Sequence, residues 1–286
     1  MRNALLFLAL LAAAAPAQKL TMPLWPNGAP GAVTDPKPEA DTTTDKQPLI
    51  AGKRVIRLGN VSNPTLSVYA PKTNNTGAAV VVFPGGGYSI LAMDLEGTEV
   101  CDWLTSIGVT CVLVKYRVPN SGPYPKPAAL QDAQRALGIV RSRAAEWQID
   151  ARKIGVLGFS AGAHLSAAVS THFDNRLYDT VDAADSASCR PDFAVIIYPG
   201  YLDGPNAEIK PTADTPPSFI VQAEDDPVHV ENATAYFLQL KQAKVPAELH
   251  IYAKGGHGYG LRQTELPVTG WPRLVETWLR TNKMME

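Results

Sequence analysis

The sequence predicts an α/β protein built on a mostly parallel, doubly wound sheet of about eight strands, with helices on both faces. Two observations lead to this fold class. From residue 54 onward, short apolar runs rich in β-branched residues alternate with longer segments of helical period. Most of the short runs are apolar at nearly every position, as expected of strands that are buried on both faces.

The predicted elements follow this alternation along the chain. The runs expected to form strands are residues 55–58, 65–69, 79–83, 110–116, 154–159, 194–198, 219–223 and 247–253. The segments expected to form helices are residues 96–107, 127–147, 161–171, 230–243 and 271–280. No internal repeat or linker interrupts the pattern, and 286 residues are enough to bury one large core, so we expect a single domain over residues 51–286.

The first residues differ in composition from the rest of the chain. Arg2 precedes an apolar run over residues 4–15, and Ala15-Pro16-Ala17 supplies small residues at its end. This pattern is typical of a secretory signal peptide, which we expect over residues 1–17. The apolar run, about 12 residues, is shorter than the ~20 that cross a membrane. The protein is therefore expected to be secreted or periplasmic without membrane insertion, with residues 18–50, rich in Pro, Thr and Asp, as an extended arm over its surface.

Charge and cysteine content narrow the class of protein further. The formal net charge is -1, and neither nucleic acid nor an acidic membrane is indicated as a partner, because both call for a basic patch. Cys101, Cys111 and Cys189 are too few for a disulfide framework, and an odd number cannot all pair within the chain. We interpret Cys101 and Cys111 as small core residues, although one bridge among the three cysteines remains open. None lies in a Gly-rich turn, which disfavours a catalytic thiol.

Ser160 is the predicted nucleophile. It lies in Gly158-Phe159-Ser160-Ala161-Gly162, between an apolar strand and a helix. At the tip of so sharp a turn the serine takes a strained backbone conformation, and only glycine two positions before and after leaves space for it. The strand-turn-helix context therefore places Ser160 at the carboxyl edge of the sheet, with the positive end of the next helix beneath it.

His257 is the predicted base that takes the serine proton. It follows the last predicted strand in a Gly-rich loop over residues 254–260, from which it can reach Ser160. Of the other histidines, two lie on the helix after the serine, one follows the candidate acids too closely, and one lies in mid-strand. These are His164, His172, His229 and His250, and His164 is expected to be a hydrogen-bonded packing residue.

The acid that orients the base is expected just after the strand at residues 219–223. Three candidates stand there, Glu224, Asp225 and Asp226. We favour Asp225, which leaves the strand end, and keep Asp226 as the second choice, since it can instead cap the turn before the next helix.

The glycine run after the strand at residues 79–83 predicts an oxyanion hole, because residues without side chains let backbone amides approach a developing negative charge. Gly86 and Gly87 are the expected donors, together with the amide of Ala161, and Tyr88 is a candidate for substrate binding or for packing on the loop. The run lacks the Lys and Ser/Thr of a phosphate-binding loop. Because the histidines are scattered and no paired cysteines occur, no metal and no cofactor is expected.

These residues resemble a family, the secreted bacterial α/β-hydrolases related to acetylxylan and feruloyl esterases. The matching stretches are residues 24–31 (LWPNGAPG), 84–88 (PGGGY), 94–99 (DLEGTE), 115–119 (KYRVP), 131–136 (QDAQRA), 158–165 (GFSAGAHL), 224–232 (EDDPVHVEN) and 255–260 (GGHGYG). Two positions depart from the family, in which His is common at the position of Pro84 and Pro at that of His229. The resemblance also implies a structural ion pair between Arg117 and Asp132.

What the resemblance implies is an α/β-hydrolase fold, a triad of Ser160, Asp225 and His257, and esterase chemistry on acylated plant polysaccharide. We therefore expect a serine carboxylesterase that removes small acyl groups, acetyl above all, from xylan-type carbohydrates or small esters. Two alternatives stay open at this point. One is a serine peptidase of the same fold, and the other is a non-catalytic carbohydrate-binding protein, which would have no need of a strained nucleophile.

Overall fold

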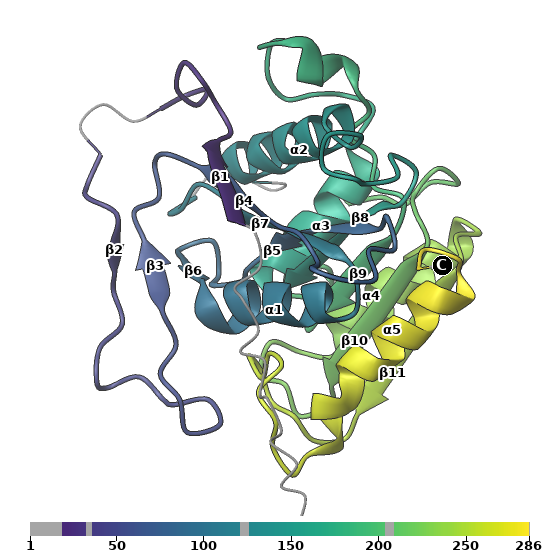
Figure 1. Ribbon diagram of the computed structural model, residues 1–286. Coiled ribbons are helices and arrows are strands. Elements are labelled where there is room, and N and C mark those ends of the chain that lie inside the picture. The colour runs from purple at the N-terminus through teal and green to yellow at the C-terminus, as the bar shows by residue number, and fades with distance from the viewer. Residues whose placement is uncertain (1–18, 33–35, 121–125, 204–208, 286) are drawn as a thin grey trace, which may run out of the picture.

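Eight strands form the central sheet of the protein, in the order β1-β4-β7-β5-β8-β9-β10-β11 (Figure 1). The computed structural model describes residues 19–32, 36–120, 126–203 and 209–285. The strands are β1 (Lys19–Pro23), β4 (Thr65–Tyr69), β5 (Ala79–Phe83), β7 (Thr110–Lys115), β8 (Ile154–Phe159), β9 (Ala194–Ile197), β10 (Ser218–Ala223) and β11 (Ala247–Tyr252). From β7 to β11 every neighbouring pair is parallel, whereas β1 and β4 run antiparallel at one edge. The predicted fold class is confirmed.

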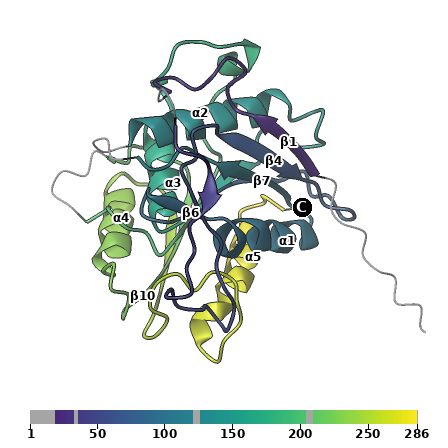
Figure 2. The ribbon, with the colours of Figure 1, turned by 90° about the vertical axis from the view of Figure 1, so that its left-hand side faces the viewer.

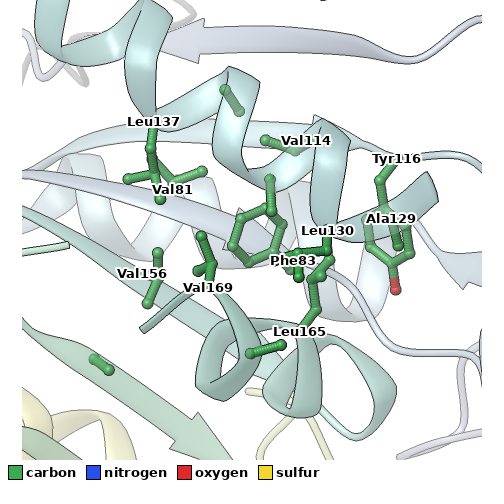
Figure 3. Packing of buried hydrophobic residues seen from close by; sticks show 14 of the residues in the cluster. Val81, Phe83, Val114, Tyr116, Ala129, Leu130, Leu137, Val156, Leu165 and Val169 are labelled. Atoms are coloured by element: carbon green, nitrogen blue, oxygen red, sulfur yellow. The ribbon is translucent and has the colours of Figure 1, made fainter. Parts of the chain in front are cut away.

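Helices cover both faces of this sheet. They are α1 (Glu99–Ser106), α2 (Pro127–Ser142), α3 (Ala161–Thr171), α4 (Glu231–Gln242) and α5 (Trp271–Thr281). Figure 2 shows α2, α3 and α4 on one side of the sheet and α1 and α5 on the other. Side chains of β5 alternate between the two faces, because Val81 belongs to the core with α2, α3 and α4 and Val82 to the core with α1 and α5. Figure 3 shows the first core, to which Val81 of β5, Leu137 of α2 and Leu165 of α3 all belong. This two-sided burial is why the central strands are apolar at every position.

A second, smaller sheet lies beside the central one (Figure 1, left). Its antiparallel strands are β2 (Ala40–Asp41), β3 (Arg57–Gly59) and β6 (Ile90–Ala92). The strand predicted at residues 55–58 therefore belongs here and not to the central sheet. The eighth strand of the central sheet is instead β1, which lies in the segment expected to be an arm. An edge strand such as β1 can be held by backbone pairing with β4 and needs no continuous apolar run.

Four elements have the predicted bounds at both ends. Strands β4, β5 and β8 and helix α3 begin and end at the predicted residues. The helix predicted over residues 96–107 begins inside a π-helical turn, Asp94–Thr98. The α-helix α1 itself starts at Glu99. The helix predicted over residues 127–147 ends at Ser142, after which the chain continues in turns.

Cys101 and Cys111 form a disulfide that joins α1 to β7. Both residues are fully buried, so the prediction that they lie in the core is confirmed. They are paired with each other, which is the one bridge that the sequence left open. Cys189 is a free, buried cysteine.

The ion pair implied by the resemblance is present. Arg117 donates from Nε to both carboxylate oxygens of Asp132 at 3.0 Å, and Trp25 Nε1 donates to Oδ1 at 2.8 Å. Asp132 lies on α2 and Trp25 follows β1, so the pair fixes the N-terminal segment to the helical layer.

Candidate active site

Ser160 lies in the turn between β8 and α3, with φ 53° and ψ -117°. This left-handed conformation is rare for a residue with a side chain. The glycines on either side are required sterically: a Cβ atom at Gly158 would collide with the carbonyl oxygen of Gly162, and one at Gly162 with that of Phe83. The local sequence thus forces the serine side chain out at the carboxyl edge of the sheet.

His257 reaches Ser160 from the loop after β11. Its Nε2 lies 2.8 Å from Ser160 Oγ, so that the hydroxyl donates to the ring nitrogen when the proton is on Nδ1. The ring packs edge-on against Tyr198, with centroids 5.0 Å apart. The structure therefore brings together the predicted nucleophile and the predicted base, which are separated by 97 positions in the chain.

The structure places Asp226, not Asp225, against His257, which corrects the favoured choice of acid. His257 Nδ1 donates to Asp226 Oδ2 at 2.7 Å. The Asp226 side chain is fully buried and also accepts from Gln222 Nε2 at 2.9 Å and from the amide of Val228 at 2.7 Å. These contacts fix the carboxylate in the orientation that holds the imidazole.

Asp225 has a different position in the same turn. Its Oδ1 accepts from the amides of Gly255 and Gly256 at 2.9 and 2.8 Å, and the amide of Gly256 above all holds the pKa of Asp225 below its usual range. Asp225 therefore anchors the start of the loop that carries His257. Two adjacent aspartates in one turn point in different directions, and residue type alone does not indicate which of them faces the base.

The glycine loop after β5 has a backbone that requires glycine and amides that lack an acceptor. Gly86 and Gly87 have φ values of 132° and 61°, and a Cβ atom at Gly86 would collide with the carbonyl of Ile90. Ala161 is the first residue of α3, where helix amides lack partners within the helix. In the part of the chain that the structure describes, no residue accepts from the amide of Gly86, Gly87 or Ala161. All three stay available as oxyanion donors.

Glu96 is a functional candidate that the sequence reasoning missed. It is 4% exposed, and its Oε2 accepts from the amide of Gly85 at 2.7 Å while Oε1 accepts from the Tyr198 hydroxyl at 2.7 Å. The Tyr198 oxygen in turn accepts from the amide of Gly260 at 3.2 Å. Burial raises the pKa of Glu96, and the hydrogen bonds from Tyr198 and Gly85 oppose that shift. The carboxyl group thus connects the glycine loop to the loop of His257. The sequence feature that could have indicated Glu96 is its place as an acidic residue in the DLEGTE stretch, which matches the family.

Tyr88 is not at the cavity surface, which corrects its candidacy for substrate binding. It is 2% exposed, and its hydroxyl lies 2.7 Å from Nδ1 of His164, which is also buried. Burial lowers the pKa of His164 to about 3, so the ring is neutral and able to accept from Tyr88. His164 is thus a buried, hydrogen-bonded packing residue, as expected, and Tyr201 lines the cavity in place of Tyr88.

A cavity of about 580 Å³ opens onto the serine and the histidine. Part of its wall comes from loops that follow the carboxyl ends of parallel strands, which is where open α/β sheets bind ligands. Another part comes from the small sheet and from the residues between β2 and β3, of which only those up to residue 50 were predicted to form an arm over the surface. The lining residues from that segment and its sheet are Pro48, Ile50, Val55, Arg57, Ile90 and Ala92.

The described residues offer neither a metal-binding cluster nor a helix that could cross a membrane. Within them, no group of three or more His, Cys, Asp or Glu side chains is placed to hold a metal ion. No helix in the same residues has the length and apolar content that crossing a bilayer requires.

Known proteins resemble this chain both in sequence and in structure. Residues 80–211 match a family described as having the alpha/beta hydrolase fold. The crystal structure of an acetyl ester-xyloside bifunctional hydrolase from Caldicellulosiruptor lactoaceticus is 32% identical and has a TM-score of 0.72, with 96% of this chain and 100% of that chain covered.

Two curated proteins extend the comparison. An acetylxylan esterase from Xylanibacter ruminicola is 30% identical over 240 residues, and a carboxylesterase from Mycobacterium tuberculosis is 28% identical over 241 residues. The matches cover 73% and 72% of this chain. This chain spans 46% of the length of the first protein and 74% of the second.

Proposed function

Because this chain belongs to the α/β-hydrolase family, we propose that it is a serine carboxylesterase that removes small acyl groups, above all acetyl, from xylan-type carbohydrates. The observation that carries the proposal is the chain of hydrogen bonds from Ser160 through His257 to Asp226, at the mouth of an open cavity. Such a chain activates a hydroxyl that is otherwise a poor nucleophile.

The geometry supports a two-step reaction. Ser160 Oγ attacks the ester carbonyl carbon while His257 Nε2 takes its proton, and Asp226 stabilises the imidazolium that forms. The amides of Gly86, Gly87 and Ala161 donate to the oxyanion. His257 then gives the proton to the sugar oxygen as the ester C–O bond breaks, so that the sugar leaves as a free hydroxyl and the acyl group stays on Ser160. Water, deprotonated by the same histidine, hydrolyses this acyl-enzyme.

The substrate class is supported by the cavity and by the relatives. About 580 Å³ holds more than an acetyl group, and the volume lies within the ordinary range for small-ligand pockets. Two of the similar proteins have names that state acetyl ester or acetylxylan substrates. A sugar unit that carries the ester can therefore occupy the space beside Ser160.

A substrate panel tests the proposal. The purified enzyme is assayed on acetylated xylan, feruloylated arabinose, 4-nitrophenyl esters of increasing chain length and a matching anilide. We expect release of acetate from xylan, faster cleavage of short than of long acyl chains, and no cleavage of the anilide. Anilide cleavage at a rate similar to ester cleavage would instead indicate a peptidase, and activity on nitrophenyl esters without any on carbohydrate esters would refute the substrate class.

We further propose that the protein acts outside the cytoplasm, after removal of residues 1–17. The disulfide between Cys101 and Cys111 supports this location, because such bonds persist in oxidising compartments. Mass spectrometry of protein recovered from the periplasm or medium of an expressing bacterium should give an N-terminus at Gln18. An intact N-terminus in the cytoplasmic fraction alone would contradict the proposal.

A further inference from the structure

Arg57 is a cation in the wall of the active-site cavity. It lies at the start of β3 in the small sheet, is partly buried, and lines the same cavity as Ser160 and His257. The reaction proposed above has no role for it.

Neutral groups alone hold the Arg57 guanidinium among the described residues. Its Nη1 lies 3.4 Å from Gln47 Oε1 and 3.4 Å from the carbonyl oxygen of Val55. No described carboxylate forms an ion pair with it, and no described residue accepts from Nε or Nη2. A guanidinium has five N–H donors in a fork that matches a carboxylate, so most of this capacity is unused.

The carboxylate that contacts the backbone of Arg57 already has an ion-pair partner. Asp41 Oδ2 pairs with Arg54 Nη1 at 2.7 Å, and Asp41 Oδ1 accepts from the backbone amide of Arg57 at 3.2 Å. The same amide donates to Thr43 Oγ1 at 2.9 Å. The backbone at Arg57 is thus held by its neighbours, while the guanidinium has no ion-pair partner among the described residues.

The other acidic and basic side chains of the cavity already have hydrogen-bond partners. Among the described lining residues these are Glu96, which binds Gly85 and Tyr198, and His257, which binds Asp226. Much of the remaining wall is apolar, including Ile50, Val55 and Val228. In such surroundings an unpaired cation favours an anionic ligand more strongly than it would in water.

We propose that Arg57 binds a carboxylate of the substrate, so that the preferred substrates are acyl esters of acidic carbohydrates, such as sugar chains that carry a uronic acid. This inference rests on the proposed esterase function and adds the charge of the substrate to it. The ester lies at Ser160, and the acidic group lies in the part of the cavity formed by the small sheet.

The test compares two esters that differ only in the charged group. They are monoacetylated methyl β-glucuronoside and monoacetylated methyl β-glucoside, assayed with the wild-type enzyme and with R57Q, R57K and R54Q. R54Q is the matched control, since Arg54 lies in the same segment but is exposed and paired. Melting temperatures are recorded for each variant, and R57K keeps the charge if R57Q folds poorly.

We expect the wild-type enzyme to prefer the glucuronoside through a lower KM. R57Q should raise the KM for the glucuronoside about ten- to hundredfold, the range for a hydrogen bond to a charged group, and change the KM for the glucoside less than about twofold. R57K should give an intermediate KM, because it lacks the fork, and R54Q should match the wild type. A wild type without preference, or equal losses in R54Q and R57Q, would overturn the inference.

A second measurement separates this inference from the proposed function. Unacetylated methyl glucuronoside is tested as an inhibitor of 4-nitrophenyl acetate hydrolysis by the wild-type enzyme and by R57Q. Inhibition that is lost in R57Q supports the carboxylate site. If neither sugar ester is hydrolysed while this inhibition is seen, the carbohydrate esterase function is refuted and the carboxylate site is not. Hydrolysis of the glucoside ester with no inhibition by the glucuronoside and no dependence on Arg57 would refute the carboxylate site alone.

Discussion

Asp225 and Asp226 are adjacent in the chain but have separate tasks at the residue scale. Asp226 binds the imidazole of His257, and Asp225 binds the amides of Gly255 and Gly256. Asp226 thus stabilises the imidazolium form of the base, whereas Asp225 holds the loop that carries the base. Substitution of each by asparagine separates the two tasks.

Asp226→Asn should lower kcat by about ten-thousand-fold, as in an unrelated triad enzyme, because an amide there favours the wrong tautomer of His257. Asp225→Asn retains an oxygen that can accept from the two glycine amides, so its effect on kcat should be much smaller. Specific activity and melting temperature are measured for both variants. A dead Asp225→Asn enzyme beside an active Asp226→Asn enzyme would reverse this assignment.

His164 should make the stability of the protein depend on pH. The unfolded-state pKa of histidine is near 6.5 and the folded-state pKa of His164 is about 3, so the unfolded state binds the additional proton between these values. The stabilisation is complete above pH 6.5 and is lost as the pH falls toward 3. Between pH 6 and 5 the unfolding free energy of the wild type should fall by about 1 kcal/mol more than that of His164→Gln, as measured by urea denaturation. Parallel pH profiles for the two proteins would contradict this prediction.

At the scale of elements, two loops are joined through one buried carboxyl group. Glu96 receives hydrogen bonds from Gly85, beside the proposed oxyanion donors, and from Tyr198, which in turn receives one from Gly260. The contact sets the distance between the loop of the base and the glycine loop. Its loss should therefore affect the rate of reaction more than substrate binding.

Tyr198→Phe should lower kcat about ten- to hundredfold with little change in KM, because the buried Glu96 carboxyl loses a hydrogen bond. Tyr236→Phe is the control, since the Tyr236 hydroxyl is buried and has no hydrogen-bond partner among the described residues. Steady-state kinetics on 4-nitrophenyl acetate measure the split. An unchanged kcat in Tyr198→Phe would show that the loops are held without this contact.

The disulfide between α1 and β7 should stabilise the fold by about 2–4 kcal/mol, largely by restricting the unfolded chain. Addition of a reductant should lower the unfolding midpoint of the wild type and of Cys189→Ala. The double variant Cys101→Ala/Cys111→Ala should start lower and show no response to reductant. A wild type that is insensitive to reductant under unfolding conditions would contradict the prediction.

At the scale of the whole molecule, the sequence predicts most reliably what is buried on both sides. Strands β5 and β8 are apolar at all or nearly all positions because both faces are covered, and the turn at Ser160 is recognisable because its glycines are sterically required. Strand β1 pairs with one strand only and has little apolar pattern, so the sequence contains no comparable feature that would predict its pairing with β4.

The parts of the site that the sequence did not reveal depend on contacts across the chain. Glu96 resembles an ordinary exposed helix residue until Tyr198 and Gly85 are brought beside it. Arg57 enters the cavity only because the small sheet folds against the central one. Local residue type predicts the nucleophile and the base, whereas the walls of the cavity follow from tertiary packing.

The central claim is that Ser160 carries the acyl group during turnover. The most direct test is to quench the enzyme with acid while it hydrolyses phenyl acetate, digest it and locate acetyl groups by mass spectrometry, with Ser160→Ala as the control. The account predicts one acetyl group on Ser160 in the wild type and none in Ser160→Ala, which should be inactive. An acetyl group on a different residue during turnover, or full activity in Ser160→Ala, would contradict it.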